Sequence, residues 1–206
     1  MRIQRSLISV DVARERSEHL RRLTVVPDYR QQRPCASCDT PCGCTRRSTL
    51  CACSCNPWCP QAAQKLTSDP IRYPIEPGVL PLVFELNASQ VMQPCWSCEG
   101  HEDAARRIVR PPGVWFYATA GLYPQLLAGH VADLKFKRRL TANWRVVLLP
   151  RSEDPLLTTF ALEPEGYADL KLERLQADLA VIAEDLSRLL RRQAEHALAE
   201  LPETPR

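Results

Sequence analysis

The sequence predicts an α+β protein, a two-layer sandwich of about four strands and two helices in the order ββαββα, preceded by an irregular cysteine-rich segment ordered by metal. Short aromatic and β-branched runs alternate with two long stretches of helical periodicity within residues 81–206. Eight of the ten cysteines lie within residues 35–59, where apolar bulk is nearly absent. A chain of 206 residues is long enough for one sizeable core and a smaller appendage.

Residues 1–34 are predicted to form a basic N-terminal arm. They hold eight Arg and four acidic residues, and Asp11 is a suitable N-cap for a weak amphipathic helix over residues 11–23. The segment has no apolar core of the kind that secretory signal peptides carry, so we expect a cytoplasmic protein with reduced cysteines. No apolar run is long enough to cross a bilayer, and we expect a soluble chain without a membrane partner.

Residues 35–59 form the first predicted metal site. Clustered thiols in a reducing compartment are typical of metal ligation, and closely spaced pairs bring two thiolates together at little cost in chain entropy. Residues 45–50 divide the candidate ligands into two groups of four, suited to two zinc ions or to one cluster with bridging thiolates: Cys35, Cys38, Cys42 and Cys44, then Cys51, Cys53, Cys55 and Cys59. Zinc would supply the folding free energy of this segment.

Two alternatives remain open for the same cysteines. Thiolates also bind iron–sulfur clusters, although the cysteine spacing of bacterial ferredoxins does not occur here. The cysteines could instead form disulfides, or belong to a flexible tail. Zinc is the preferred cofactor and an iron–sulfur cluster the alternative.

Residues 60–80 are predicted to be a proline-rich linker. Proline removes a backbone donor, so the stretch should be neither a helix nor a central strand. The prolines that space it out are Pro60, Pro70, Pro74, Pro77 and Pro81.

Four strands are expected in residues 81–206. The first is short and covers residues 83–86, and the second, over residues 114–118, is rich in aromatic and β-branched residues. Residues 144–149 would place apolar side chains on both faces of a strand, which favours a central position in the sheet. The fourth strand covers residues 158–162.

Two helices complete the predicted domain. The first follows Gly121, has Pro124 at an early position, and runs to about residue 140. The second covers residues 168–198 and carries leucine or isoleucine at spacings of three and four. That stripe indicates a helix packed on the sheet, or alternatively the seam of a homodimer.

A second metal site is predicted at Cys95, Cys98 and His101. Their C-x2-C-x2-H spacing resembles a shortened zinc knuckle, and Gly100 permits the tight turn that a chelate needs. His130 is the first candidate for the fourth ligand because it lies on the apolar stripe of its helix, with a hydrogen-bonded core histidine as the alternative. Acidic side chains of the same loop are further alternatives: Glu99, Glu102 and Asp103.

Two chemical activities are compatible with this second site. A zinc ion with three protein ligands and a water is typical of hydrolytic sites, and Glu102 could then act as general base. The C-x-x-C pair could instead support thioredoxin-like redox chemistry, with residues 102–109 as a short helix. Nucleoside deaminases are excluded because no H-x-E or C-x-E triplet precedes Cys95.

The function predicted from the sequence is a zinc-binding adaptor whose metal orders a small surface for a protein or nucleic-acid partner. The net charge of +3 is too small to indicate a nucleic-acid binder by itself. A basic patch at residues 135–139, together with Arg46 and Arg47, makes nucleic acid conceivable, while a solvated helix end is the alternative for the patch. The alternative function is an iron–sulfur or open-zinc enzyme or electron carrier.

Overall fold

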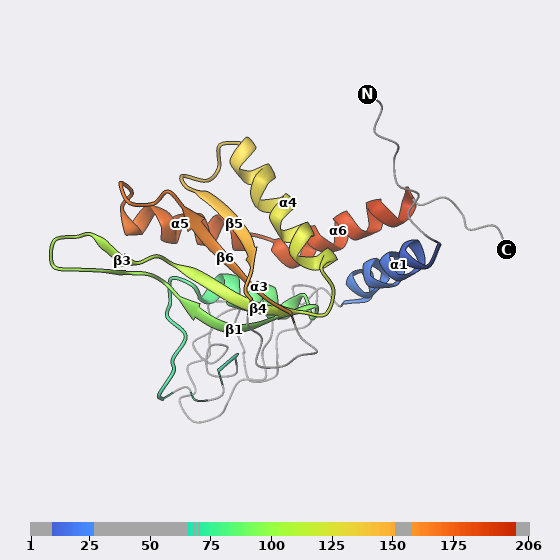
Figure 1. The fold of residues 1–206 in the computed structure, drawn as a ribbon, viewed down its shortest axis with the longest axis horizontal. Helices are drawn as coiled ribbons and strands as arrows, with labels where there is room; N and C mark the ends of the chain where they lie inside the picture. Colours follow the sequence, from blue (N-terminus) through green and yellow to red (C-terminus); the bar gives the residue numbers. More distant parts are fainter. Residues whose placement is uncertain (1–9, 27–65, 68, 70, 151–157, 201–206) are drawn as a thin grey trace, which may run out of the picture.

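The fold is described by a computed structural model that covers residues 10–26, 66–67, 69, 71–150 and 158–200. These residues form five helices and a four-stranded antiparallel sheet, a mixed α/β architecture in agreement with the predicted class (Figure 1). The helices are α1 (Val10–Val25), α3 (Leu80–Ala88), α4 (Leu122–Phe136), α5 (Leu172–Ala183) and α6 (Leu186–Ala199).

The sheet has the strand order β1-β4-β6-β5, so β1 and β5 are its edges. Its strands are β1 (Met92–Cys98), β4 (Gly113–Ala118), β5 (Asn143–Leu148) and β6 (Thr158–Glu165), and every neighbouring pair is antiparallel. Between β1 and β4 the chain continues into a small hairpin of β2 (His101–Glu102) and β3 (Ile108–Arg110), which projects beyond the sheet in Figure 1.

The core lies between one face of the sheet and the helices. On β4, Val114 and Phe116 are buried whereas Trp115 between them is 40% exposed, the alternation expected of a strand with one covered face. Phe116 stacks on Phe160 of β6, with ring centroids 5.9 Å apart. Helix α3 packs against β1 and α5, while α4 packs against β5.

The strand predicted over residues 83–86 is wrong, because those residues belong to α3. The apolar run from Leu80 to Leu86 is buried along its whole length, and such a run does not distinguish a buried helix from a buried strand. Pro81 lies in the first helical turn, where a missing N–H costs nothing. The first strand of the sheet is β1, which begins at Met92.

The prediction that residues 144–149 form a central strand is also wrong. They form β5 at the edge of the sheet, and β6 is central between β4 and β5. Leu148 of β5 is 63% exposed and Val146 and Val147 are only partly buried, which fits a strand at the edge of the sheet. The strand at residues 114–118 and the helix after Gly121 are confirmed as β4 and α4, and the strand at 158–162 is confirmed within the longer β6.

The short helix considered for residues 102–109 is wrong, because this segment forms the β2–β3 hairpin. The Asp103 carboxylate closes the turn by accepting hydrogen bonds from the backbone N–H of Ala105 and of Arg107. Arg106 adopts a left-handed conformation with φ of 61°. Local side-chain bonding of this kind stabilises turns in competition with helices.

The long C-terminal helix is interrupted once. Helix α5 ends at Ala183 and α6 begins at Leu186, with Asp185 between them at φ 58°. The stripe of leucine and isoleucine continues across the break, and most of it is buried in the core of the single chain: Leu175, Leu179, Ile182, Leu186 and Leu190. A homodimer through this helix stays a prediction.

The predicted N-terminal helix is confirmed as α1, and it packs against α6. Leu20 and Leu23 are buried and belong to the main core cluster, so α1 is part of the same folded body as the sheet. No helix in the described part of the chain is long and apolar enough to cross a membrane.

Candidate metal centre

Three metal-ligating side chains converge at the end of β1. Oxygen, sulfur and nitrogen atoms of Glu76, Cys98 and His101 all lie within 4.8 Å of one another. His101 Nε2 is 3.2 Å from Glu76 Oε1, close enough for an ion pair when the imidazole is protonated. A carboxylate, a thiolate and an imidazole are the three ligand types that zinc takes in proteins.

The three residues come from three different segments. Glu76 precedes α3, Cys98 is the last residue of β1, and His101 opens β2. The second carboxylate oxygen of Glu76 accepts a hydrogen bond from the backbone N–H of Glu99 at 2.7 Å, which holds the carboxylate beside the strand end. Its first oxygen is thereby directed at His101.

Gly100 makes the turn that brings Cys98 and His101 together. Its φ is 91°, a conformation that side chains rarely adopt. A Cβ added there would lie 2.5 Å from the Cδ1 atom of Leu172. The Gly100 N–H also donates a hydrogen bond to the Cys98 sulfur at 3.4 Å, so the predicted role of this glycine in a tight turn is confirmed.

Glu99, an alternative fourth ligand in the sequence, is used elsewhere. Its carboxylate accepts a hydrogen bond from the backbone N–H of Gly78 at 2.7 Å, and its carbonyl oxygen accepts one from the Gln176 side chain at 3.1 Å. Together with the bond from the Glu99 N–H to Glu76, these contacts fasten the segment before α3 to the end of β1. These hydrogen bonds therefore hold in place the turn after Cys98 on which the cluster lies.

Cys98 is buried and its thiol is free. Burial raises the pKa of this thiol, the nearby Glu76 carboxylate raises it further, and the hydrogen bond from Gly100 opposes both. The thiol is thus protonated at neutral pH when no cation is bound. A metal ion would displace that proton, because only the thiolate is a strong ligand.

Cys95 and His130 lie outside this cluster. Cys95 is exposed and occupies a β-bulge, the irregularity between Pro94 and Trp96 in the β1–β4 pairing. His130 is buried, and its Nε2 lies 3.2 Å from the carbonyl oxygen of Ile182, which is the core arrangement considered as the alternative from the sequence. The structure thus brings together two of the four predicted ligands of the second site, Cys98 and His101.

Two other loop acids are engaged in ion pairs. Glu102 pairs with Arg106 at 3.0 Å, and Asp103 pairs with Arg107 at 2.7 Å. Both pairs lie within the β2–β3 hairpin and stabilise its turn. Neither acid belongs to the three-residue cluster.

Glu76 is the ligand candidate that sequence reasoning missed. It lies 22 residues before Cys98, inside the segment predicted to be a linker. No spacing rule connects a carboxylate at that distance to a thiol, and only the path of the chain around α3 brings the two together. The eight cysteines within residues 35–59 lie outside the described residues.

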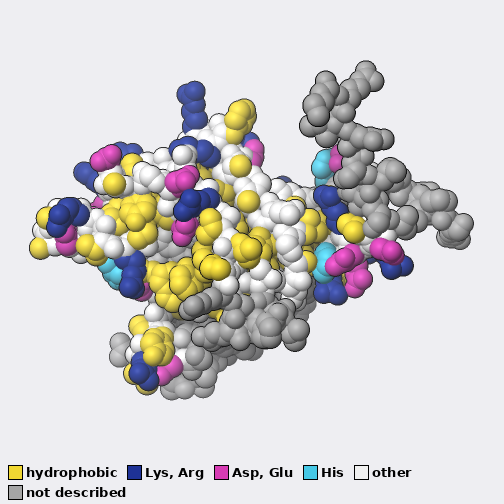
Figure 2. Space-filling model, in the orientation of Figure 1, with side chains coloured by type: hydrophobic (Ala, Val, Ile, Leu, Met, Phe, Trp, Pro, Cys, Tyr) yellow, Lys and Arg dark blue, Asp and Glu magenta, His cyan; other side chains and the backbone are white. Residues whose placement is uncertain are grey.

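A groove of about 760 Å³ lies beside the cluster, along β1. Glu76, Cys98 and His101 all line it, so a metal bound by them would face the groove. Figure 2 shows hydrophobic side chains gathered over the β1 and β4 part of the sheet. The groove is also lined by polar, basic and aromatic side chains: Thr67, Arg72, Tyr73, Gln93, Trp96, Ser97, Arg110 and Tyr117.

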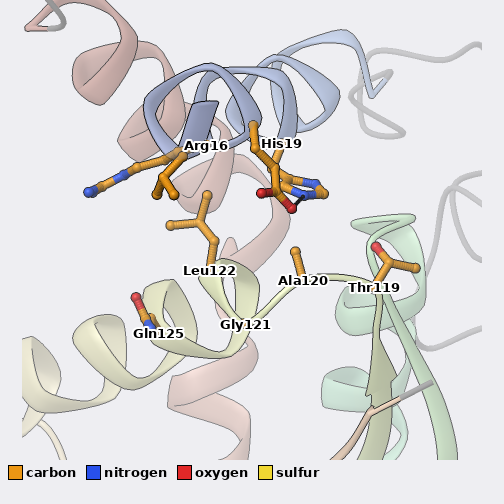
Figure 3. Close-up of a pocket in the computed structure, with 9 residues that line it drawn as sticks. Arg16, His19, Thr119, Ala120, Gly121, Leu122 and Gln125 are labelled. Carbon is orange, nitrogen blue, oxygen red and sulfur yellow. Dashed lines mark ion pairs between the residues drawn. The ribbon is translucent and has the colours of Figure 1, made fainter. Parts of the chain in front are cut away.

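A smaller cavity of about 260 Å³ lies between α1 and the start of α4. Figure 3 shows Arg16 and His19 of α1 on the side of α1 that faces residues 119–122. His19 Nδ1 is hydrogen-bonded with the Tyr123 hydroxyl at 3.1 Å, and its Nε2 lies 3.7 Å from Glu15. Both ring nitrogens of His19 have partners within the chain. We therefore interpret this cavity as part of the packing of α1 against the start of α4.

Carboxylates pair with two of the four basic side chains in the patch at residues 135–139. Lys137 pairs with Asp133 at 2.7 Å, Arg139 pairs with Glu184 at 2.5 Å, and Lys135 donates to the Thr141 carbonyl oxygen. The patch therefore stabilises the end of α4 and its contact with the end of α5.

Comparison with known proteins leaves the geometry as the guide to function. No protein-family model, curated protein or solved structure matches the chain.

Proposed function

We propose that this chain is a zinc-binding interaction protein in which Glu76, Cys98 and His101 hold a zinc ion. The supporting observation is that their ligand atoms lie within 4.8 Å of one another although they come from three segments. In a tetrahedral site with zinc bonds of about 2.0–2.3 Å, the ligand atoms lie about 3.3–3.8 Å apart, so zinc binding would draw the three side chains slightly closer together. The ion would join the segment before α3 to β1 and β2, and so order one wall of the groove.

The partner surface in this proposal is the groove and the adjoining face of β1 and β4. Among the described residues, the helices cover the face that buries Val114 and Phe116, and in this proposal the opposite face receives the protein or nucleic-acid partner. Trp115 supports this division because it lies on the opposite face and is 40% exposed. Exposed aromatic side chains are enriched where proteins bind partners.

The cysteines within residues 35–59 are included in the proposal as further zinc ligands. They would hold their zinc ions independently of the three-residue cluster, since they contain enough thiols for complete sites of their own. Loss of the proposed cluster should therefore remove one zinc ion from the chain and leave the others bound.

The first test is the zinc content of matched variants of the full chain. We expect Cys98→Ser and His101→Ala each to lose one zinc ion per chain relative to the wild type, measured by elemental analysis after anaerobic purification. Cobalt substitution adds a spectroscopic signature, because a thiolate ligand gives intense near-ultraviolet absorption that Cys98→Ser should diminish.

The matched controls substitute the same two residue types, cysteine and histidine, at positions outside the three-residue cluster. Cys95→Ser alters an exposed cysteine outside the cluster, and His196→Ala alters an exposed histidine on α6 that pairs with Glu200. Both should retain the wild-type zinc content. Equal zinc content in His101→Ala, Cys98→Ser and the wild type would refute the site, and circular dichroism of each variant verifies that it is folded.

Hydrolysis is a second candidate because the cluster supplies three ligands and faces the groove. A water in the fourth position would be activated by the ion. Glu102, the predicted general base, is paired with Arg106 instead. We expect no zinc-dependent cleavage of an activated nitrophenyl ester, and a cleavage rate abolished by His101→Ala would favour the enzyme over the interaction protein.

A further inference from the structure

Aromatic side chains are concentrated along the groove beside the three-residue cluster of Glu76, Cys98 and His101. Tyr73 is 59% exposed and Trp96 is 36% exposed, and Tyr117 also lines the groove. Trp96 is braced by Trp115 across the strand pair, with ring centroids 4.8 Å apart and planes tilted by 40°. A braced, partly exposed indole loses little conformational entropy when a flat ligand stacks on it.

Two arginines of the described chain, Arg72 and Arg110, line the same groove. Within the described residues, neither Arg72 nor Arg110 takes part in an ion pair, whereas Arg107, Arg139 and Arg145 all do. The Arg72 guanidinium lies over the Tyr73 ring, 5.3 Å from its centroid. Glu76 is the one carboxylate among the described lining residues, and zinc would neutralise it. The groove therefore presents positive charge beside aromatic rings.

Polar side chains complete the lining. Gln93 and Ser97 of the edge strand β1 offer an amide and a hydroxyl, and Thr67 also lines the groove, with its hydroxyl donating a hydrogen bond to the Tyr73 carbonyl oxygen. An amide can both donate and accept, which suits the edge of an unpaired base.

We propose that this groove binds single-stranded nucleic acid, with bases stacked on Tyr73 and Trp96 and phosphates held by Arg72 and Arg110. Exposed aromatic rings stack on bases only when the bases are unpaired, which favours a single strand over a duplex. The two arginines alone would suit an acidic peptide equally well, and the aromatic rings decide for nucleic acid. This inference rests on the proposed function, because zinc fixes the wall that contains His101.

The test is fluorescence anisotropy of short labelled oligothymidylate and oligouridylate with the zinc-loaded full chain at low salt. We expect saturable binding that weakens linearly in a plot of log affinity against log salt. Tyr73→Ala should weaken binding about 5-fold to 100-fold, the range for loss of one stacked base. Arg110→Ala should weaken binding of both oligonucleotides alike and reduce the salt slope by about one.

Matched substitutions on other surfaces serve as controls. Phe136→Ala removes an aromatic side chain that is 87% exposed at the end of α4, and Arg192→Ala removes an exposed arginine on α6. Both should bind the oligonucleotides as the wild type does. Equal losses in the controls and in the groove variants would overturn the proposal, because binding would then be general charge attraction.

Three further outcomes would overturn the inference. They are the absence of binding at low salt, equal affinity for a duplex, and binding of polyglutamate at the groove in place of oligonucleotide. Zinc content measured on the same samples separates this inference from the proposed function. If His101→Ala holds one zinc ion fewer than the wild type but the wild type binds no oligonucleotide, the zinc site stands and only the nucleic-acid partner is refuted.

Discussion

Burial determines the protonation of two single residues in this chain. Cys98 and His130 are both buried, and burial favours the neutral form of each. For Cys98 the pKa is raised, so the thiol keeps its proton until a cation replaces it. For His130 the pKa is lowered, chiefly by burial, although the hydrogen bond with Ile182 opposes the shift.

Replacing His130 with Leu is expected to reduce the acid sensitivity of the fold. As the pH falls through the unfolded pKa of about 6.5, the unfolded chain binds a proton that the folded chain does not. The free energy of unfolding of the wild type therefore decreases below about pH 6.5, by up to about 1.4 kcal/mol per pH unit from this residue. Urea titrations across pH measure the slope, and His130→Leu should show a shallower one.

The control for this pH dependence is His196→Ala, which removes an exposed histidine. The same urea titrations of this variant show whether a change in slope is specific to the buried histidine. If the free energy of unfolding of His130→Leu falls with decreasing pH as steeply as that of the wild type, burial of His130 does not cause the loss of stability in acid.

At the scale of elements, α5 is tied to the loop before β5 by one buried carboxylate. Asp178 accepts hydrogen bonds from the backbone N–H of Thr141 at 2.8 Å, from that of Ala142 at 2.9 Å and from the Trp144 indole N–H at 2.9 Å. Two donors from the loop before β5 and one from β5 itself therefore bond to the same side chain. This contact orients α5 against the edge of the sheet.

Asp178→Asn should lower the free energy of unfolding by about 2–4 kcal/mol, because an amide turns a donor toward donors and loses the charge-assisted bonds. Urea denaturation monitored by circular dichroism measures this change. Asp169→Asn, the same substitution at an exposed position, should change the stability by less than about 0.5 kcal/mol. Similar losses in the two variants would show that the buried hydrogen bonds do not stabilise the fold.

Substitutions in helix α1 test whether this helix belongs to the hydrophobic core. Leu20→Ala should cost about 2–5 kcal/mol if α1 belongs to the core, as its burial indicates. Val25→Ala, at a position of the same helix that is 76% exposed, should be nearly neutral. Urea denaturation compares them, and a neutral Leu20→Ala would mean that α1 is an independent arm.

At the scale of the whole molecule, metal binding and folding should be coupled. A ligand that binds only the folded chain adds about 2.7 kcal/mol when present at 100 times its dissociation constant. The proposed ion would join the segment before α3 to β1 and β2, segments that unfolding separates. We therefore expect added zinc to raise the thermal midpoint of the apo wild type.

His101→Ala should show a smaller zinc-dependent rise of the midpoint, while His196→Ala should show the full rise. Calorimetry of the apo and zinc-loaded chains measures both. The sheet and helices should persist in the apo form, because their core is made of apolar side chains from β1, β4, β6 and the helices. A chelated chain that lost all its secondary structure would contradict this expectation.

Periodicity and composition by themselves determined the class of fold, most of its elements and the proximity of Cys98 and His101, two members of the candidate metal cluster. Helices α1 and α4 and strand β4 follow from local patterns, and Cys98, Gly100 and His101 are close in sequence, so their chelate geometry is readable there. The identity of α3 was not readable, because a short apolar run is compatible with helix and strand alike.

Only the tertiary structure decided which distant residues meet. Glu76 joins Cys98 because the chain passes around α3, and His130 turns toward Ile182 because α5 packs on its helix. Cys95 and Cys98 lie three residues apart in the extended strand β1, where Cys95 is exposed and Cys98 is buried, although the sequence spacing suggests a pair. Local patterns reflect interactions within a few residues, whereas sites built from separate segments depend on packing, which no local spacing encodes.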